Sequence, residues 1–280
     1  MKKISRRSFL AAAAVSAAAL ALTACGGSAS TASSAAASSV AASSEAASTS
    51  AAAAELTTVE AGKLTMATNA AFPPYEMTTD AGEFEGIDID TAKAIAEKLG
   101  LELQIDDMDF DAALLSVQQG KADIVMAGVT VTDERKAVMD FSDSYATGIQ
   151  SIIVPEGSDI TSPDDLAGKK IGTQRGTTGY IYCSDDFGDD AVVAYDDGLT
   201  AVQALNNGQV DAVVIDNAPA KEFVAANPGL VILDTSYAEE DYAIGLAKGS
   251  ALEDAVNAAL EELKADGTLQ SIVDKYITAE

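Results

Sequence analysis

Residues 128–135 read Gly-Val-Thr-Val-Thr-Asp-Glu-Arg, and they follow the apolar run Ile124-Val125-Met126-Ala127. The run predicts a buried strand, and the second threonine with two acids after it predicts the start of a helix. Arg135 then falls in the first helical turn, where the helix dipole disfavours a cation by about 0.3–1 kcal/mol. It therefore needs an anionic partner, which is either Asp133 or Glu134 beside it or the carboxylate of a ligand.

On both sides of this stretch, short apolar runs alternate with helical patterns. Apolar residues recur at helical spacing from Asp88 to Leu99 and stop at Gly100, and residues 110–119 repeat the arrangement before Gly120. Strands are predicted at 64–68, 101–105, 123–127 and 148–154, and helices at 251–264 and 269–276 close the chain. The alternation predicts an α/β fold in which mixed sheets are flanked by helices.

A short sequence pattern also occurs twice in the chain. Residues 117–125 are matched by residues 205–213: each segment has a helix end, a glycine, two further residues, an aspartate and an apolar strand. We therefore expect two lobes of similar build. Lobe 1 is expected to comprise residues 55–150 and 243–280, and lobe 2 residues 151–242.

Composition excludes several classes of function. The formal net charge of the 280 residues is −27, which argues against nucleic-acid binding because phosphate neutralisation needs a basic surface. The chain has no histidine, which excludes His-based triads, His general bases and His-ligated metals. We predict no cofactor and no metal site. With Cys25 assigned to processing below, Cys183 has no partner for a disulfide and is expected to be an ordinary thiol.

The first 54 residues have the composition of targeting and linking segments. Residues 1–24 have a basic start, an apolar stretch and a small-residue end, which predicts an export signal. Leu22-Thr23-Ala24-Cys25 resembles the bacterial lipobox, in which the cysteine becomes the lipidated first residue of the mature protein. Residues 5–10 also resemble a twin-arginine signal, so the export route stays open. Residues 25–54 are mostly Ala, Ser, Thr and Gly and are predicted to form a disordered tether.

Six short motifs occur in order along residues 60–280. They are Gly86-Ile87-Asp88-Ile89-Asp90, Asp109-Phe110-Asp111-Ala112-Ala113-Leu114, the stretch 128–135, Asp140-Phe141-Ser142, Leu166-Ala167-Gly168-Lys169-Lys170-Ile171-Gly172 and Ala265-Asp266-Gly267-Thr268. In this order, behind a lipobox and a tether, they resemble the solute-binding proteins of polar amino-acid ABC importers. The resemblance implies the periplasmic-binding-protein-like type II fold, in which two α/β lobes are joined by two hinge strands and enclose a ligand cleft.

The function implied by the resemblance is binding without catalysis. The protein would capture a free amino acid at the extracytoplasmic face of the bacterial cell membrane and deliver it to the permease of an ABC importer. It would be a monomer and would touch the membrane only through its lipid anchor. Two alternatives stay open. One is an enzyme on the same fold, similar to cyclohexadienyl dehydratase, and the other is a receptor that reports the ligand to a partner.

The resemblance also implies a site that holds both charges of an amino acid. The arginine matching Arg135 binds the carboxylate, assisted by the Thr130 N–H and by a loop that here contains Thr177 and Thr178. The aspartate matching Asp216 takes the ammonium group. Gly128 would add its carbonyl, and Phe72 and Phe110 match aromatic residues that enclose the ligand side chain. Judged by pattern alone, Asp216 could instead cap a helix, the two threonines could be turn or cap residues, and the phenylalanines could be core.

Specificity is expected to depend on positions where this chain departs from the family. Members that bind cationic or glutamine-like side chains often carry Asp in place of Asn69, and some carry Lys in place of Gln174 and His in place of Ile215. Asn69 and Gln174 can hydrogen-bond a neutral polar side chain, while Phe72, Phe110 and Ile215 would tolerate an apolar one. We therefore expect a neutral amino acid, although Arg175 keeps an acidic one open.

Overall fold

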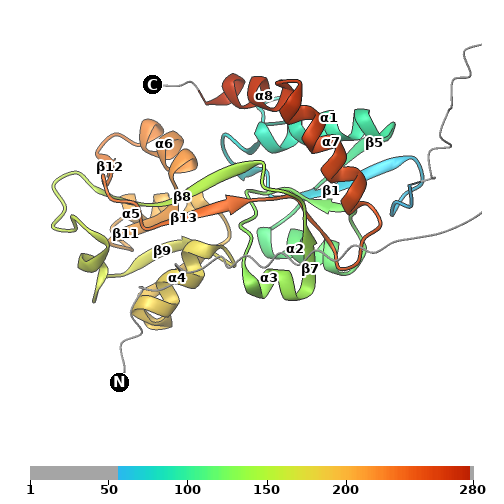
Figure 1. Cartoon of the computed structure of the whole chain (residues 1–280). Coiled ribbons are helices and arrows are strands. Elements are labelled where there is room, and N and C mark those ends of the chain that lie inside the picture. Colours follow the sequence, from blue (N-terminus) through green and yellow to red (C-terminus); the bar gives the residue numbers. More distant parts are fainter. Residues whose placement is uncertain (1–55, 278–280) are drawn as a thin grey trace, which may run out of the picture. The chain divides into compact units, whose positions relative to one another are not determined.

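The computed structural model describes residues 56–277, which lie within one compact unit, Ala52–Glu280 (Figure 1). The predicted export signal, lipobox cysteine and tether lie outside the described residues. The described part is a mixed α/β structure with two main sheets, so the predicted fold class is confirmed. Within residues 56–277 no helix has the length and apolar character needed to cross a membrane.

The first main sheet has the strand order β5-β1-β6-β14-β7, and we call the part built on it lobe 1. Its strands are β1 (Lys63–Thr68), β5 (Glu102–Asp107), β6 (Ile124–Val125), β7 (Met139–Phe141) and β14 (Gly245–Ala247). Strand β1 is parallel to β5 and β6, whereas β14 is antiparallel to β6 and β7. A small antiparallel sheet beside it consists of β2 (Ala71–Phe72), β3 (Glu76–Thr78) and β4 (Phe84–Glu85).

Five helices flank the first sheet. They are α1 (Ile87–Leu99), α2 (Phe110–Gln118), α3 (Asp133–Val138), α7 (Glu253–Ala265) and α8 (Thr268–Tyr276). Figure 1 shows α1, α7 and α8 together on one side of the sheet and α2 and α3 on the other. The apolar faces of α1 and α7 pack on the sheet with Leu64, Met66 and Ile124, all fully buried.

The second main sheet has the order β10-β9-β11-β8-β12, with β13 also paired to β8, and the part built on it is lobe 2. Its strands are β8 (Ala146–Pro155), β9 (Ile171–Gln174), β10 (Val192–Tyr195), β11 (Ala212–Asp216), β12 (Leu230–Ile232) and β13 (Ala238–Tyr242). Its helices are α4 (Thr178–Phe187), α5 (Gly198–Asn206) and α6 (Asn217–Ala226), with short 3-10 turns at Pro163–Leu166 and Asp189–Ala191. Residues of α5 and α6 join one apolar cluster, and Cys183 of α4 joins another on the opposite face.

Two strands cross between the lobes. The chain enters lobe 2 along β8 and returns along β13, and these strands pair antiparallel from Ala146↔Tyr242 to Gln150↔Ala238 (Figure 1). They occupy the place of the two hinge strands that the resemblance implies.

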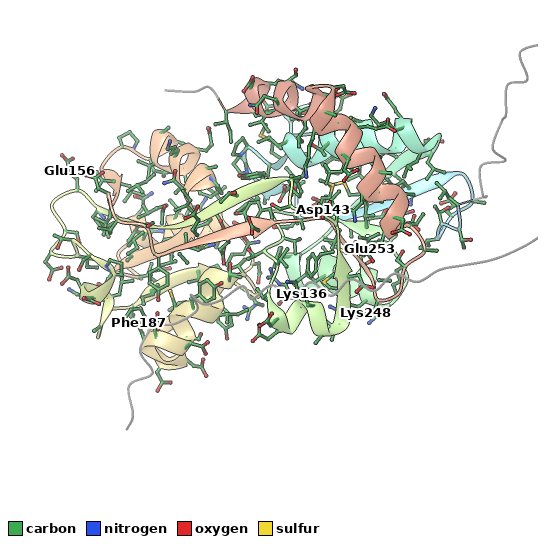
Figure 2. The ribbon with its side chains drawn as sticks, viewed as in Figure 1. Lys136, Asp143, Glu156, Phe187, Lys248 and Glu253 are labelled. Carbon is green, nitrogen blue, oxygen red and sulfur yellow. The ribbon has the colours of Figure 1, made fainter. Side chains whose placement is uncertain are left out.

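The motif Asp140-Phe141-Ser142 fastens the returning strand to lobe 1. The Asp140 carboxylate accepts hydrogen bonds from Lys248 Nζ at 2.6 Å and from the Gly249 N–H, and the Lys248 ammonium also donates to the Lys136 carbonyl at 2.9 Å. Figure 2 labels Lys136 and Lys248 at this end of the lobe. The Ser142 hydroxyl accepts from the Ile244 N–H. The motif is therefore structural.

The strand predicted at 123–127 is shorter than expected, and β6 has only Ile124 and Val125. The backbone leaves the ladder because Gly128 has a φ of +55°, and a Cβ there would lie 2.9 Å from Cε1 of Phe72. Only glycine fits this bend. The remaining predicted strands and helices are present with shifts of at most two residues at their ends.

Candidate functional site

A single cavity between the lobes brings together all ten residues that the resemblance assigns to ligand binding. Its lining consists of Asn69, Phe72, Glu76, Phe110, Ala127, Gly128, Thr130, Arg135, Gln174, Thr177, Thr178 and Asp216. Glu76 and Ala127 are the additions that sequence reasoning missed. The cavity volume is about 10 Å³, which is about the room that one water molecule needs. The lobes are therefore closed on each other, and an amino acid can enter only after they separate.

Arg135 is held by lobe 1 and reaches lobe 2. Helix α3 begins as predicted, because the Thr132 hydroxyl accepts a hydrogen bond from the Arg135 N–H at 3.2 Å. The guanidinium donates to the Thr130 carbonyl at 2.8 Å and to the Gly176 carbonyl of lobe 2 at 3.2 Å, and its carbon lies 5.3 Å from the centre of the Phe110 ring. Only two of its five N–H groups are used in these bonds.

No carboxylate among residues 56–277 forms an ion pair with Arg135. The neighbours Asp133 and Glu134 are both exposed and neither pairs with the buried guanidinium, so the local-acid explanation is wrong. The side chain is 8% exposed, and burial lowers the pKa of the guanidinium, an effect that the carboxylate of Glu240 opposes. A buried cation without a paired anion is unfavourable, and a ligand carboxylate would remove that cost.

Asp216 stands opposite on lobe 2, at the end of β11. It occupies the first position before α6 but makes no side-chain capping bond, so the helix-cap alternative is wrong. Its Oδ2 accepts from Nε2 of Gln150 at 2.8 Å, and its Oδ1 accepts a short hydrogen bond from the Tyr242 hydroxyl. Burial is the main cause that raises the pKa of Asp216 to about 7. The carboxylate is thus poised to ionise when a cation arrives.

The two predicted loop threonines have different roles. Thr177 caps helix α4, since its hydroxyl accepts from the Tyr180 N–H at 3.3 Å and donates to the Gln174 carbonyl at 2.8 Å. The cap alternative is therefore correct for its side chain. Thr178 is the first residue of the helix, and its buried hydroxyl lies 3.5 Å from that of Thr130 across the cleft. The N-terminal N–H groups of α4 add a favourable environment for an anion.

The two amide side chains meet across the cleft. Nε2 of Gln174 donates to Oδ1 of Asn69 at 2.9 Å, and Nδ2 of Asn69 donates to the Met108 carbonyl at 2.9 Å. Nε2 of Gln174 also lies 3.4 Å from the Asp196 carbonyl. A chain of hydrogen bonds therefore joins the backbones of the two lobes through the residues proposed for specificity.

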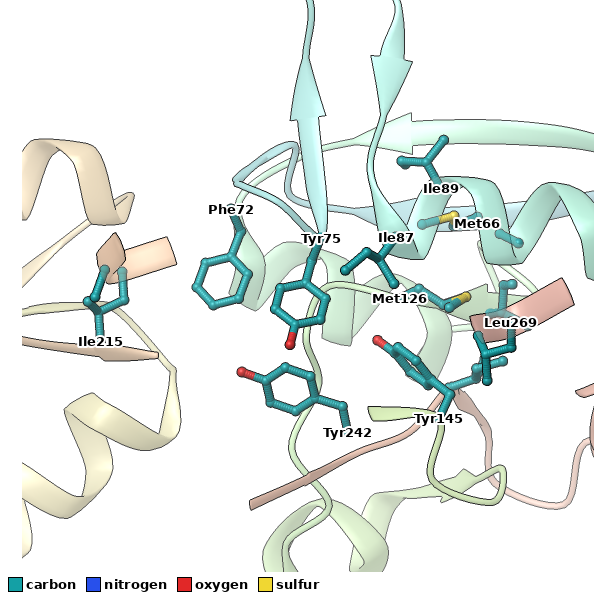
Figure 3. Packing of buried hydrophobic residues seen from close by; sticks show 14 of the residues in the cluster. Met66, Phe72, Tyr75, Ile87, Ile89, Met126, Tyr145, Ile215, Tyr242 and Leu269 are labelled. Atoms are coloured by element: carbon teal, nitrogen blue, oxygen red, sulfur yellow. The ribbon is translucent and has the colours of Figure 1, made fainter. Parts of the chain in front are cut away.

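The aromatic side of the cavity comes from lobe 1. Phe72 and Phe110 are nearly buried and line the cavity, and both also pack in apolar clusters. Tyr75 lies between Phe72 and Tyr242, with ring centres at 5.9 and 5.3 Å, and does not line the cavity (Figure 3). The phenylalanines are thus both wall and core.

The prediction for Ile215 is wrong. Successive residues of a strand point to opposite faces, so the strand that turns Asp216 toward the cleft turns Ile215 away. Its Cδ1 would lie 2.4 Å from a Cβ at Gly198, and the same position faces Phe223. Figure 3 shows Ile215 apart from the ring cluster of Phe72, Tyr75 and Tyr242. It is a core residue of lobe 2.

Glu76 is the charged residue of the cavity that the sequence did not predict. It lies on β3, is fully buried and lines the cavity. Burial, and next the adjacent carboxylate of Asp88, raise its pKa well above the ordinary value. Asp88 accepts from the Gly128 N–H at 3.0 Å and from the Tyr145 hydroxyl at 2.8 Å. Burial raises the pKa of Asp88 to about 6, and these two donors limit the rise. Since Asp88 already has two donors, Glu76 is the one of the pair that keeps a proton.

Glu76 gave little signal in the sequence. A glutamate after a Pro-Pro turn is expected at the surface, because acids are rarely buried without a partner. In the part of the chain that is described, no group of three or more His, Cys, Asp or Glu could hold a metal ion. Cys183 is buried, which raises the pKa of its thiol.

Comparison with known proteins identifies relatives along nearly the whole described part. The family model of the bacterial extracellular solute-binding proteins, family 3, matches residues 64–279. The L-cystine-binding protein TcyJ of Escherichia coli is 33% identical over 226 residues, covering 79% of this chain and 85% of that protein. The arginine-binding extracellular protein ArtP of Bacillus subtilis is 33% identical over 230 residues, covering 78% of this chain and 87% of that protein.

A solved structure agrees with these relatives. The arginine-, lysine-, histidine-binding protein ArtJ from Geobacillus stearothermophilus is 34% identical and aligns with a TM-score of 0.75, covering 78% of this chain and 96% of that one. The ligands in these names differ in their side chains, but all are free amino acids.

Proposed function

Since this chain belongs to the bacterial extracellular solute-binding proteins of family 3, we propose that it captures a free amino acid between its lobes and delivers it to the permease of an ABC importer. The relatives named above are amino-acid-binding proteins and not enzymes, which removes the dehydratase alternative. The observation that carries the proposal is Arg135, a buried cation without an ion-pair partner among residues 56–277, facing Asp216 across a cavity that both lobes line.

Both charges of an amino acid have a counterpart in this cavity. The carboxylate would bind the free N–H groups of Arg135 and the N-terminus of α4, and the ammonium would bind Asp216 and the hydroxyl of Thr130. Because the two strong partners belong to different lobes, one ligand bridges them. Binding therefore favours the closed arrangement, and release requires the hinge strands β8 and β13 to bend.

We propose a neutral side chain for the ligand. Asn69 and Gln174 bond to each other and to backbone carbonyls, so the far end of the site offers amide groups instead of a free charge. A neutral polar or apolar side chain can replace part of this amide contact without leaving a buried charge unpaired.

A second candidate is a cationic side chain, and Glu76 is the observation that favours it. Its carboxyl is buried in the cavity wall and could ionise against a ligand cation. The variant Glu76→Gln separates the two candidates. It should abolish binding of arginine and lysine if the side chain is cationic, and it should leave binding of a neutral amino acid within about threefold if the side chain is neutral.

A thermal-shift screen of the purified protein against the twenty amino acids tests the proposal as a whole. We expect one or a few amino acids to raise the melting temperature, because a ligand at 100 times its Kd adds about 2.7 kcal/mol to the folded state. Calorimetry then gives Kd and stoichiometry. If no amino acid raises the melting temperature, the proposed function is wrong.

The lipid anchor is a separate proposal with its own test. Cys25→Ser should release the protein from the membrane fraction, and Cys183→Ser is the matched control because its thiol is buried within lobe 2. Retention of the Cys25→Ser protein in the membrane fraction would contradict the anchor without affecting the binding proposal.

A further inference from the structure

Glu240 is a buried carboxylate at the point where both lobes and both hinge strands meet. It lies on β13, is 6% exposed, and stands outside the set of residues that line the cavity. Its Oε2 accepts hydrogen bonds from the hydroxyls of Thr178 at 2.9 Å and Thr130 at 3.1 Å, and from Nε2 of Gln150 at 3.0 Å. One oxygen thus collects donors from lobe 1, lobe 2 and the other hinge strand.

We propose that Glu240 is a positioning residue. It would make the hydroxyls of Thr130 and Thr178 hydrogen-bond acceptors for the ammonium group of the ligand, and this inference rests on the proposed function. A hydroxyl has one proton to donate and two lone pairs. When the proton goes to Glu240, the hydroxyl has only lone pairs left for other partners. The Thr178 hydroxyl uses one of them for Nε2 of Gln150 at 3.3 Å, and its other lone pair stays available.

The two hydroxyls could instead bond to each other, since they lie 3.5 Å apart. That bond would be long, whereas the carboxylate oxygen of Glu240 lies closer, at 2.9–3.1 Å, and is the stronger acceptor. Both protons therefore point to Glu240. An ammonium group, which donates and never accepts, fits the surface that remains.

Gln150 keeps the arrangement in place. It is 1% exposed and sits on β8, and its Nε2 also donates to Oδ2 of Asp216 at 2.8 Å. One amide group therefore joins the carboxylate that would bind the ammonium to the carboxylate that polarises the hydroxyls. Because Glu240 also attracts Arg135, its charge offsets that of the guanidinium near the ammonium position.

A purely structural role predicts a different outcome. If Glu240 only held the lobes together, its loss would weaken every ligand equally. If it sets hydroxyl polarity, its loss should weaken ligands that carry an ammonium more than ligands that carry a hydroxyl in the same place, because a hydroxyl can accept as well as donate.

The test compares Glu240→Gln with wild type and with Glu239→Gln, an exposed neighbour on the same strand. The probes are each neutral amino acid that binds wild type and its α-hydroxy acid, such as alanine with lactate, serine with glycerate, or leucine with 2-hydroxyisocaproate. Calorimetry measures both affinities at one pH. We expect the ratio of amino-acid to hydroxy-acid affinity to fall about tenfold or more in Glu240→Gln and to stay unchanged in Glu239→Gln.

An equal loss for both probes would overturn the role of Glu240 while leaving the proposed function intact. A wild-type protein that binds no amino acid would overturn both. If Glu240→Gln does not fold, Glu240→Asp keeps the charge but shortens the reach, and it should lower the same ratio by a smaller factor. An unchanged ratio in that folded variant would equally contradict the inference.

Discussion

The two lobes present the same local design and opposite charges. In lobe 1, helix α2 ends, Gly120 turns at a φ of +65°, and β6 leads to Arg135; in lobe 2, helix α5 ends, Gly208 turns at +66°, and β11 ends in Asp216. The pattern that occurs twice in the sequence, at 117–125 and 205–213, therefore corresponds to a repeated helix–turn–strand unit. The difference lies in the residues that follow each strand, which place a cation on one side of the cleft and an acid on the other.

This comparison explains how one small ligand can couple two lobes. A zwitterion has its charges a few ångströms apart, and neither lobe alone offers strong partners for both. Each lobe contributes one strong charge, and backbone or hydroxyl groups supply the rest. Removing either charge should therefore weaken the coupling without disturbing the repeated units, and the lobes can be tested separately.

The largest effect is expected from lobe 1. Arg135→Ala should lower the affinity for an amino acid by at least about 100-fold, because the ligand carboxylate would lose its charged partner inside a closed cavity. Calorimetry and thermal shift measure the loss. Arg175→Ala is the matched control, since that arginine is exposed near the same cleft and bonds to the Ala194 carbonyl. Unchanged binding in Arg135→Ala would place the carboxylate elsewhere.

The counterpart in lobe 2 should show a pH dependence. Asp216 must be ionised to hold the ammonium, and its pKa is raised to about 7. Below that pKa the carboxyl is neutral, so affinity should rise about tenfold per pH unit up to pH 7 and level off above it. Asp216→Asn should bind about 10–100-fold more weakly and lose most of this slope.

The groups that face Asp216 are the hydroxyl of Tyr242, the amide of Gln150 and the carboxylate of Glu240. Calorimetry between pH 5.5 and 8.5 compares wild type and Asp216→Asn with Asp211→Asn, an exposed acid before the same strand. A pH slope that persists in Asp216→Asn would assign the titration to another group.

A smaller effect concerns the bend that gives lobe 1 its site. Gly128→Ala should destabilise the fold by about 2–4 kcal/mol, because alanine would be strained at a φ of +55° and would clash with Phe72 at 2.9 Å. Gly120→Ala, at +65° with no atom within 4 Å of the new Cβ, should cost only about 1 kcal/mol. Denaturant unfolding measures both. Equal costs would show that Phe72 moves aside freely.

Much of the fold followed from the sequence because the signals are local. Gly100 and Gly120 end helices where predicted, and Thr132 caps α3, since such positions depend on nearby backbone geometry. The ten predicted site residues meet in one cavity because a resemblance to a family carries its tertiary arrangement. Local sequence patterns did not predict the burial of Glu76 or the side of the sheet to which Ile215 points.

The hydrogen bonds around Glu240 could not be predicted from the sequence at all. Its partners come from positions 62 to 110 residues away in the chain, on β8, on α4 and on the segment between β6 and α3. Nothing in the acid-rich segment Ala238–Tyr242 distinguishes it from its exposed neighbour Glu239 except strand alternation, which puts alternate residues on opposite faces. Pairings at such separation depend on how the lobes close, which no local pattern encodes.

The last prediction concerns the repeated unit itself. Its aspartate fastens the adjacent strand in both lobes, but to different degrees: Asp123 is buried and accepts from the Val59 and Thr65 N–H groups at 2.7 and 2.8 Å, whereas Asp211 is exposed and accepts from the Lys170 N–H at 2.7 Å. Asp123→Asn should therefore destabilise the fold by about 3 kcal/mol and Asp211→Asn by about 1 kcal/mol.

Denaturant midpoints of the two variants, measured under the same conditions, check this difference. Because neither aspartate lines the cavity, amino-acid affinity should stay within about twofold of wild type in both. Equal destabilisation would mean that the second hydrogen bond and the burial of Asp123 add nothing to the strength of the unit. A loss of affinity in either variant would instead mean that the aspartate at the start of the strand affects the charged ligand-binding residue beyond its end. The stability of the repeated unit and the affinity of the site would then not be independent.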